Sequence, residues 1–324
     1  MALDLGELTH LELFEVQPGD SKRKKAIDSP YLHRLQRVHF VLFDILPLIG
    51  TLAALALLFV RPIGAVEISL FLVMWALTGF GISVGYHRLF THRSFTTVAP
   101  VRATLAILGS MAGQGGIISW SAMHRRHHEC GDHEGDMHSP NLSGPGWKGK
   151  LRGLAHAHFT WMMAHPYPNV VHYAPDLLRD PVVMAISRHY YRWILLGLLI
   201  PTALGGLLTW SWMGCLTGFL WGGAVRMFVL EHSLWSLNSF CHMFGSRPFA
   251  TRDESRNIAL FAPFIFGEAW HHNHHAFPNS AHFGLAWYRL DPGYWLIRLL
   301  QWLGLASDVK VPSRQQIALR MQRA

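Results

Sequence analysis

Histidine is the residue type in this sequence that is best suited to do chemistry. The chain has 22 histidines among 324 residues, and nine of them fall into four short clusters. The clusters are His87-Arg-Leu-Phe-Thr-His92, His124-Arg-Arg-His127-His128, Asn238-Ser-Phe-Cys-His242, and His271-His272-Asn273-His274-His275, of which His272 is not one of the nine. Imidazole binds iron, zinc, copper and nickel well. Because nine ligands exceed what one ion can use, the sequence predicts a centre of two metal ions.

The spacing inside two of the clusters has a physical reason. On a helix, residues i, i+3 and i+4 lie on one face. His124, His127 and His128 therefore present their imidazoles together, and the last cluster repeats this pattern. His272 points off that face, so we expect it to support a ligand or to be exposed. One histidine near a membrane is usually a packing residue, but four clusters, each placed close to a membrane helix or a helical turn, favour metal binding.

The elements that must position these clusters are predicted to be membrane helices. Half of the residues are hydrophobic and only 15% are charged, against roughly 25% in soluble domains. Uncharged runs predict four spans, each near the ~20 residues needed, at about 39–60, 63–86, 193–210 and 212–235. The uncharged run 103–120 is diluted by glycine, and we expect it to lie in the interface. The predicted fold is an all-α membrane protein of four transmembrane helices with a cytoplasmic helical cap around the metals.

Four spans place all four clusters and both termini on one side of the membrane. Of the 28 lysines and arginines, only Arg61 falls on the other side and only Arg226 lies inside a span. The positive-inside rule makes the common side cytoplasmic. We therefore expect a cytoplasmic arm at 1–37, a membrane domain at 38–300 and a cytoplasmic tail at 301–324. The basic run Lys22-Arg23-Lys24-Lys25 suits anionic lipid or phosphate, and no nucleic-acid partner is expected.

At the histidine clusters the sequence resembles the membrane fatty acyl desaturases of the stearoyl-CoA desaturase type, over roughly residues 35–300. In that family nine such histidines bind a di-iron centre, and the motif asparagine reaches one iron through water. The resemblance assigns two Fe²⁺ ions to His87, His92, His124, His127, His128, His242, His271, His274 and His275, with Asn238 bound through water. Asp132, Asp136 and His138 also match the stretch after the second cluster, and Glu268 or Asp136 is expected to orient a ligand imidazole.

The resemblance implies a dioxygen-dependent acyl-CoA desaturase in the lipid bilayer of a bacterial cell. It would insert a cis double bond at the delta-9 position of a long-chain acyl-CoA. The two electrons must come from a separate ferredoxin or cytochrome, because the sequence has no HPGG haem motif and no cysteine cluster. A di-iron hydroxylase or ketolase is the nearest alternative. A histidine-rich zinc transporter is an alternative of another class, although carriers usually place polar ligands in mid-span.

Five residues are candidates for binding the substrate. Arg152, Arg188 and Arg192 suit the phosphates of CoA, because guanidinium binds phosphate well; Arg188 and Arg192 could equally be topological anchors. Gly79 leaves space for methylenes on the second span. Trp75 lies 12 residues, or ~18 Å along a helix, before His87, and we expect it to form the floor of an acyl tunnel. The alternative is that Trp75 packs against a helix or faces lipid.

Overall fold

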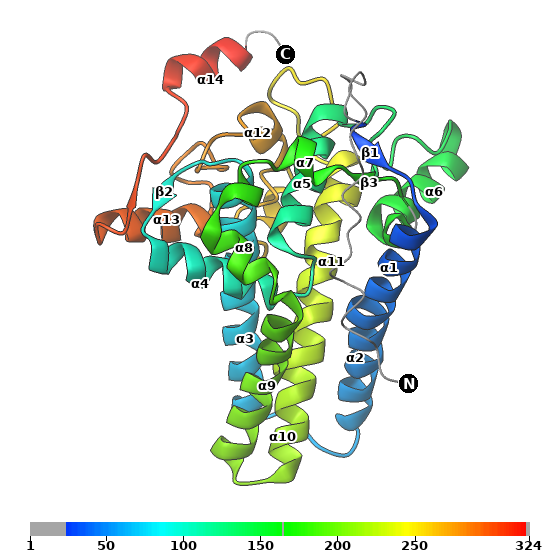
Figure 1. Cartoon of the computed structure of the whole chain (residues 1–324), viewed down its shortest axis with the longest axis vertical. Coiled ribbons are helices and arrows are strands. Elements are labelled where there is room, and N and C mark those ends of the chain that lie inside the picture. Colours follow the sequence, from blue (N-terminus) through cyan, green and yellow to red (C-terminus); the bar gives the residue numbers. More distant parts are fainter. Residues whose placement is uncertain (1–23, 164, 322–324) are drawn as a thin grey trace.

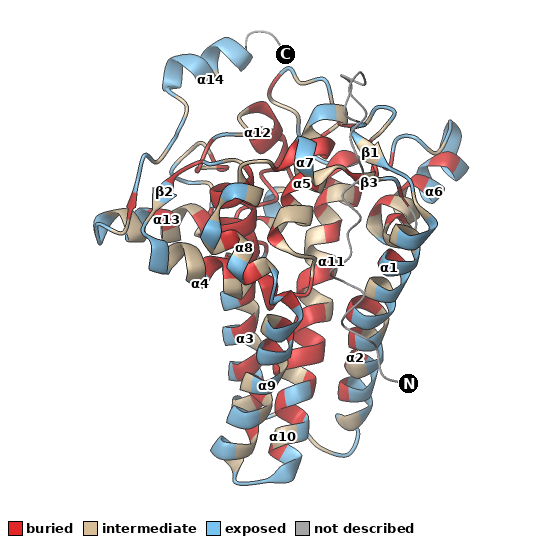
Figure 2. Cartoon of the chain, in the orientation of Figure 1, coloured by how far each residue is buried: buried red, intermediate tan, exposed pale blue. Residues whose placement is uncertain are grey.

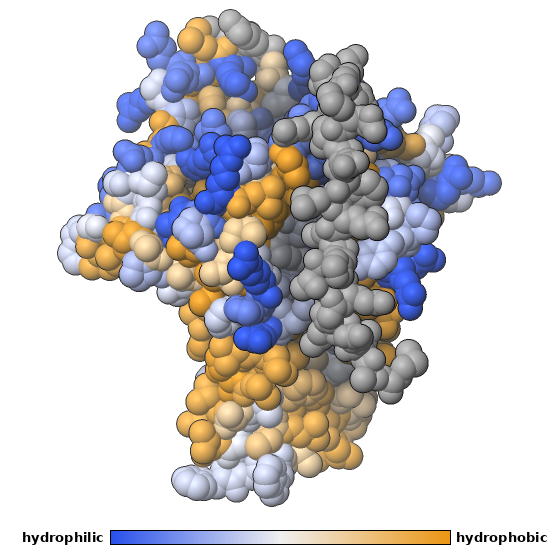
Figure 3. All heavy atoms as spheres, viewed as in Figure 1, coloured by the Kyte–Doolittle hydropathy of each residue, from blue (hydrophilic) through white to orange (hydrophobic). Residues whose placement is uncertain are grey.

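Four long helical segments form the body of the molecule. The structure is a computed structural model that describes residues 24–163 and 165–321; residues 1–23 of the predicted arm and 322–324 of the predicted tail lie outside the described residues. The segments Pro30–Leu57, Ala65–Thr91, Tyr190–Thr209 and Trp212–His242 are each long and apolar enough to cross a membrane. They stand side by side below a helical cap (Figure 1). Apolar side chains cover the lower part of the bundle (Figure 3). The predicted four-helix membrane fold is confirmed.

Three of the four segments are continuous helices assembled from shorter pieces. The first consists of α1 (Pro30–Phe40), η2 (Val41–Ile45) and α2 (Leu46–Leu57), and the second of α3 (Ala65–Phe80) and η3 (Gly81–Thr91). The third is α9 (Tyr190–Thr209), and the fourth comprises α10 (Trp212–Gly218), η6 (Phe219–Val225), α11 (Arg226–Ser239) and η7 (Phe240–His242). The pieces η2, η3 and η6 are π-helical. Such insertions often mark functional sites, and η3 carries His87.

The helices extend further into the cap than the uncharged runs suggest. The first begins at Pro30 rather than near 39, the second ends at Thr91 rather than 86, and the fourth ends at His242 rather than 235. A polar side chain ends an apolar run but does not end a helix. The additional turns pack against the cap, where Gln36, His87 and His242 are buried. The motifs of His87 and His242 therefore lie at the cap ends of membrane helices.

The glycine-rich run 103–120 forms two short elements rather than a span. Helix α4 (Ala99–Ser110) ends in a turn, and α5 (Ile117–Cys130) follows it. Helix α4 packs closely on η3, because a Cβ on Gly81 would lie 2.2 Å from the backbone nitrogen of Gly109. Glycine thus serves close packing here, and the prediction that this run does not cross the membrane agrees with the helices found in the described residues.

The cap consists of short helices and two small antiparallel ladders. Strand β1 (Ala26–Ile27) pairs with β3 (Tyr167–Pro168), and β2 (Thr96–Thr97) pairs with β4 (Ala306–Ser307). The remaining elements are α6 (Gly146–His158), η4 (Thr160–Met163), α7 (Val170–Tyr173), η5 (Leu177–Arg179), α8 (Pro181–Ser187), η8 (Ala259–Phe261), α12 (His271–Ala276), α13 (Pro292–Trp302) and α14 (Arg314–Met321). Buried residues concentrate where the cap meets the bundle (Figure 2).

Candidate metal centre and acyl cavity

The nine motif histidines form two adjacent clusters in the described chain. In each cluster the ring nitrogens that could bind an ion all lie within 4.8 Å of one another. The five-histidine cluster contains His87, His92, His124, His128 and His274, and the four-histidine cluster contains His127, His242, His271 and His275. All nine predicted ligands are therefore brought together, and His272 belongs to neither cluster.

Two short helices supply ligands to both clusters. On α5, His124 and His128 face the five-histidine cluster, whereas His127 faces the other. On α12 the division is reversed, because His274 joins the five-histidine cluster. At about 100° per residue, positions i and i+4 differ by about 40°, while i+3 lies about 60° to the other side of i. The His-x-x-His-His pattern can thus serve two neighbouring ions from one helix.

The geometry of the ring nitrogens fits bound metal ions. His274 Nε2 lies 3.0 Å from His87 Nε2 and 2.9 Å from His128 Nε2. In the four-histidine cluster, His242 Nε2 lies 2.9 Å from His271 Nε2. Converging lone pairs repel one another unless a proton or a cation lies between them. Buried Nε2 atoms of three further members have no hydrogen-bond partner among the described residues, namely those of His92, His127 and His275. A metal ion satisfies such nitrogens.

Carboxylates hold four of the ligand histidines by the other ring nitrogen. His87 Nδ1 donates to Glu268 over 2.6 Å, and His242 Nδ1 donates to Asp132 over 2.7 Å. The remaining pairs are His127 Nδ1 with Asp136 at 3.0 Å and His275 Nδ1 with Asp253 at 3.1 Å. Each bond fixes the tautomer so that Nε2 keeps its lone pair toward the cluster. Glu268 and Asp136 were predicted to orient ligands; Asp253 was not, because no motif spacing marks it.

Burial keeps most ligand imidazoles neutral. Burial, and then the neighbouring histidines, lower the pKa of His124, His128 and His274 well below the ordinary value of 6.5. The same causes act on His271. Burial alone would lower the pKa of His127, but the attraction and hydrogen bond of Asp136 raise it overall. A neutral imidazole is the form that binds metal.

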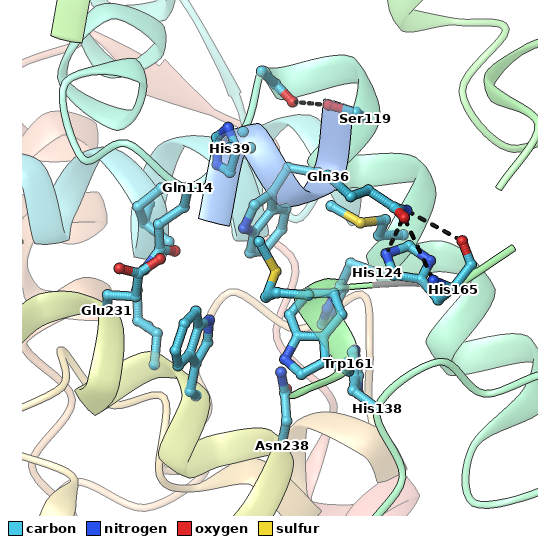
Figure 4. Close-up of a pocket in the computed structure, with 18 of the residues that line it drawn as sticks. Gln36, His39, Gln114, Ser119, His124, His138, Trp161, His165, Glu231 and Asn238 are labelled. Atoms are coloured by element: carbon cyan, nitrogen blue, oxygen red, sulfur yellow. Dashed lines mark hydrogen bonds between the residues drawn. The ribbon is translucent and has the colours of Figure 1, made fainter. Parts of the chain in front are cut away.

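A cavity of about 360 Å³ adjoins both clusters. Figure 4 shows this cavity, with His124 among the residues that line it. Its walls come from α1, η3, the α4–α5 turn, α5, η4, the start of α9, α11 and α12. The ligands His87, His124 and His271 line it. Trp161 and Asn238 extend toward the same space from η4 and α11 (Figure 4). The apolar part of the wall also includes Leu35, Ile82, Met123, Leu234 and Trp235. An apolar chain can therefore lie directly beside the ring nitrogens.

Comparison with known proteins identifies the family. A family model described as fatty acid desaturase matches residues 64–301, more than half of the chain. The chain belongs to the fatty acid desaturase family. It is 51% identical over 303 residues to hex-5-enoyl-[acyl-carrier protein] acetylenase of Moorena producens (strain JHB), covering 93% of this chain and 94% of that relative.

Two further relatives are named as lipid desaturases. The chain is 37% identical over 248 residues to sn-1 stearoyl-lipid 9-desaturase of Anabaena variabilis, covering 76% of this chain and 84% of the relative. It is 35% identical over 246 residues to Delta-9 acyl-lipid desaturase 1 of Arabidopsis thaliana, covering 76% of this chain and 75% of the relative. The resemblance predicted from the histidine clusters is confirmed.

The other residues that the sequence marked as candidates in this desaturase lie outside the two histidine clusters. Asn238 lies on the cavity wall beside the ligands, although it belongs to neither cluster. His272 is fully buried, where its Nε2 accepts from the backbone nitrogen of Phe249 and its Nδ1 bonds Ser255. It is therefore not exposed. Arg152, Arg188 and Arg192 are exposed on α6 and around the start of α9, and none of them lines the cavity.

The space expected beside Gly79 is filled in this desaturase. A Cβ on Gly79 would lie 2.1 Å from the Phe266 ring, so the glycine accommodates that ring rather than methylenes. Trp75 packs on the same ring, with centroids 4.8 Å apart. Neither Trp75 nor Gly79 lines the cavity. The prediction of an acyl tunnel along this helix face is therefore wrong. The distance of Trp75 from His87 along the helix could not reveal that a loop covers this face.

Proposed function

We propose that this desaturase removes two hydrogens from adjacent carbons of an acyl chain lying in the cavity, beside two iron ions held by the nine histidines. The balanced reaction consumes one dioxygen, two electrons and two protons, and yields the unsaturated chain and two waters. The observation that carries the proposal is that His87, His124 and His271 belong to the metal-binding clusters and also line the cavity.

The chain's own residues supply binding and orientation. Bound iron would contribute the activation of dioxygen. Asp132, Asp136, Asp253 and Glu268 keep the imidazoles in the ligating tautomer. The apolar wall formed by Leu234, Trp235 and Trp161 excludes water and holds methylenes close to the clusters. Positioning of this kind is a large part of what a protein adds to such chemistry.

We propose an acyl carrier protein as the carrier of the acyl chain. The support is the 51% identical relative, whose name gives a hex-5-enoyl chain on an acyl carrier protein. Acyl-CoA, predicted from the sequence, is the second candidate, because it carries the same phosphopantetheine arm and the exposed Arg152, Arg188 and Arg192 suit phosphate. A long-chain, delta-9 substrate on a phospholipid is the third form, taken from the lipid desaturase relatives. The electrons come from a separate ferredoxin or cytochrome.

Direct turnover tests these assignments. The protein in nanodiscs is supplied with dioxygen, a reduced ferredoxin or cytochrome, and matched acyl chains on carrier protein, CoA or phospholipid. We expect a product that has lost two hydrogens, fastest with the carrier protein, and no product with His128→Ala. A product that has gained oxygen would make the protein a hydroxylase. Zinc in place of iron, with no turnover of any substrate, would overturn the proposal in favour of a transporter.

A further inference from the structure

A short loop runs along the face of the second membrane helix that carries His87. Near the metal ligands, the Glu268 carboxylate of this loop accepts from Ser83 Oγ over 2.5 Å and from His87 Nδ1 over 2.6 Å. Two residues earlier in the loop, Phe266 meets the same helix face at Gly79, one turn below Ser83. The loop therefore combines a ligand-orienting carboxylate with an aromatic ring placed deeper in the bundle.

The Phe266 ring fills a gap that the helix leaves for it. The residue is buried, and its ring centroid lies 4.8 Å from those of both Trp75 and Phe80. The ring occupies the volume that any side chain at Gly79 would need. Interdigitation of a large residue with a glycine leaves no passage for a chain of methylenes between the loop and the helix.

The backbone of Phe266 has a strained conformation. Its φ is +56°, a region in which a bulky residue is an outlier. The conformation is held by the carbonyl of Phe266, which accepts from Arg88 Nη2 at 3.2 Å and from the backbone nitrogen of Gly293 at 3.1 Å. Strain maintained by surrounding bonds is concentrated at functional sites. Glycine would adopt this φ without cost, yet the chain has an aromatic residue there.

On the face of the second membrane helix, the cavity does not reach this ring. On this face it is lined by Ile82, His87 and Glu268, whereas Phe266, Gly79 and Trp75 are not part of its wall. On this helix Ile82 precedes His87 by five residues, whereas Trp75 precedes it by twelve. Along this face, the cavity therefore extends less than half as far from His87 as an open path to Trp75 would.

We propose that Phe266 is the stop that limits how far an acyl chain extends past the metal ligands. It makes this desaturase act close to the methyl end of its substrate, so that only a few carbons lie beyond the oxidised pair. This inference rests on the proposed acyl desaturation and adds a specificity-determining residue to it. Removing the ring connects the cavity to the Gly79–Trp75 face and admits longer tails.

Three variants test the stop. Phe266→Ala removes the ring, and Phe266→Ala combined with Gly79→Leu refills the same space from the helix side. Phe264→Ala is the matched control, because Phe264 is an exposed aromatic residue in the same loop. With acyl carrier protein substrates of six to sixteen carbons, we expect Phe266→Ala to shift the ratio of kcat/KM toward long chains at least tenfold. The double variant should restore the wild-type profile, and the control should keep it. A purely structural role for Phe266 would not give this restoration.

A binding measurement separates this inference from the proposed function. Stabilisation of the protein in nanodiscs by hexanoyl- and hexadecanoyl-pantetheine is measured as a shift in thermal midpoint, with iron content as the folding check. We expect the long chain to stabilise Phe266→Ala more than wild type, even if no turnover is detected. Equal responses of wild type, Phe266→Ala and the double variant, with normal iron content, would overturn the stop. Absence of turnover with these binding differences intact would overturn the desaturation instead.

Discussion

At the scale of single residues, the carboxylate partners decide how well the histidines hold metal. Glu268 is fully buried and bonds His87, Ser83 and Arg88. We predict that Glu268→Gln lowers iron affinity about 10- to 100-fold, the usual effect of losing such a partner, while the helical content is kept. Glu254→Gln is the control, because Glu254 is half exposed and its side chain pairs with Arg247 and Arg256 instead. Equal iron content in both variants during chelator titration would contradict the assigned role.

Two adjacent histidines on α12 should respond to substitution in different ways. His271 is a member of the four-histidine cluster, so His271→Gln leaves three ligands and should lose iron from that cluster. His272 bonds Ser255 and Phe249 away from the clusters. His272→Gln should keep its iron but lose about 1–3 kcal/mol of stability, the cost of an unsatisfied buried group. Metal analysis and thermal unfolding of the two proteins separate the effects. Iron loss in His272→Gln as complete as in His271→Gln would refute this distinction.

The sequence was informative about these residues only where spacing has a physical meaning. Periodicity accounted for six of the nine clustered histidines, because a helix repeats its faces at i+3 and i+4. His87, His92 and His242 rested instead on the family resemblance. Asp253 was missed, because it lies in a loop that belongs to no histidine motif and that folds back onto His275. The burial of His272 was also missed. Helix periodicity shows that His272 points away from the ligand face, but it does not show which residues cover that side.

At the scale of elements, buried hydrogen bonds between Gln36 and His165 tie α1 to the cap. Gln36 Nε2 donates to His165 Nε2 over 3.1 Å, and it also donates to the His165 carbonyl. Burial lowers the pKa of His165 to about 4. The folded protein therefore keeps this imidazole neutral at pH values where the unfolded chain, near the ordinary 6.5, already binds a proton. The stability that this group contributes is complete above pH ~6.5 and is lost progressively as the pH falls toward 4.

Thermal unfolding across pH tests this contact. The stability difference between wild type and His165→Gln should narrow as the pH falls from 6.5 to 4, by on the order of 3 kcal/mol at most. The control variant is His172→Gln, which removes an exposed imidazole of the cap. A His165→Gln difference that is independent of pH would show that the imidazole contributes by packing alone.

The helices also show which part of the fold could be predicted from the sequence. Uncharged runs predicted four membrane helices, because lipid requires about 20 apolar residues per span. They could not predict the turns that continue past the last apolar residue, such as Pro30 to Val38, since these depend on packing with the cap. For the same reason the sequence assigned residues up to 37 to an arm, although Leu35 and Gln36 line the cavity.

At the scale of the whole molecule, the apolar bundle and the polar cap imply one orientation in the membrane. The apolar surface of the bundle lies below the cap that holds the histidines (Figure 3). Arg61 is at the far end of the bundle, and the basic residues of α6, among them Lys148, Lys150 and Arg152, are at the cap. From the positive-inside rule we predict that the cap, the metal centre and the described ends of the chain face the cytoplasm.

Cysteine labelling of intact cells tests this orientation. Phe59 is almost fully exposed at the far end of the first helix, and Lys148 is exposed on α6 of the cap. We predict that Phe59→Cys reacts with a membrane-impermeant maleimide in intact cells, because the far end faces outward. Lys148→Cys should react only after the cells are broken. Both changes are made in a Cys215→Ser background, and that parent gives the baseline for Cys130 and Cys241. Labelling of Lys148→Cys in intact cells at the rate of Phe59→Cys would place the cap outside, where a cytoplasmic electron donor and carrier protein could not reach it.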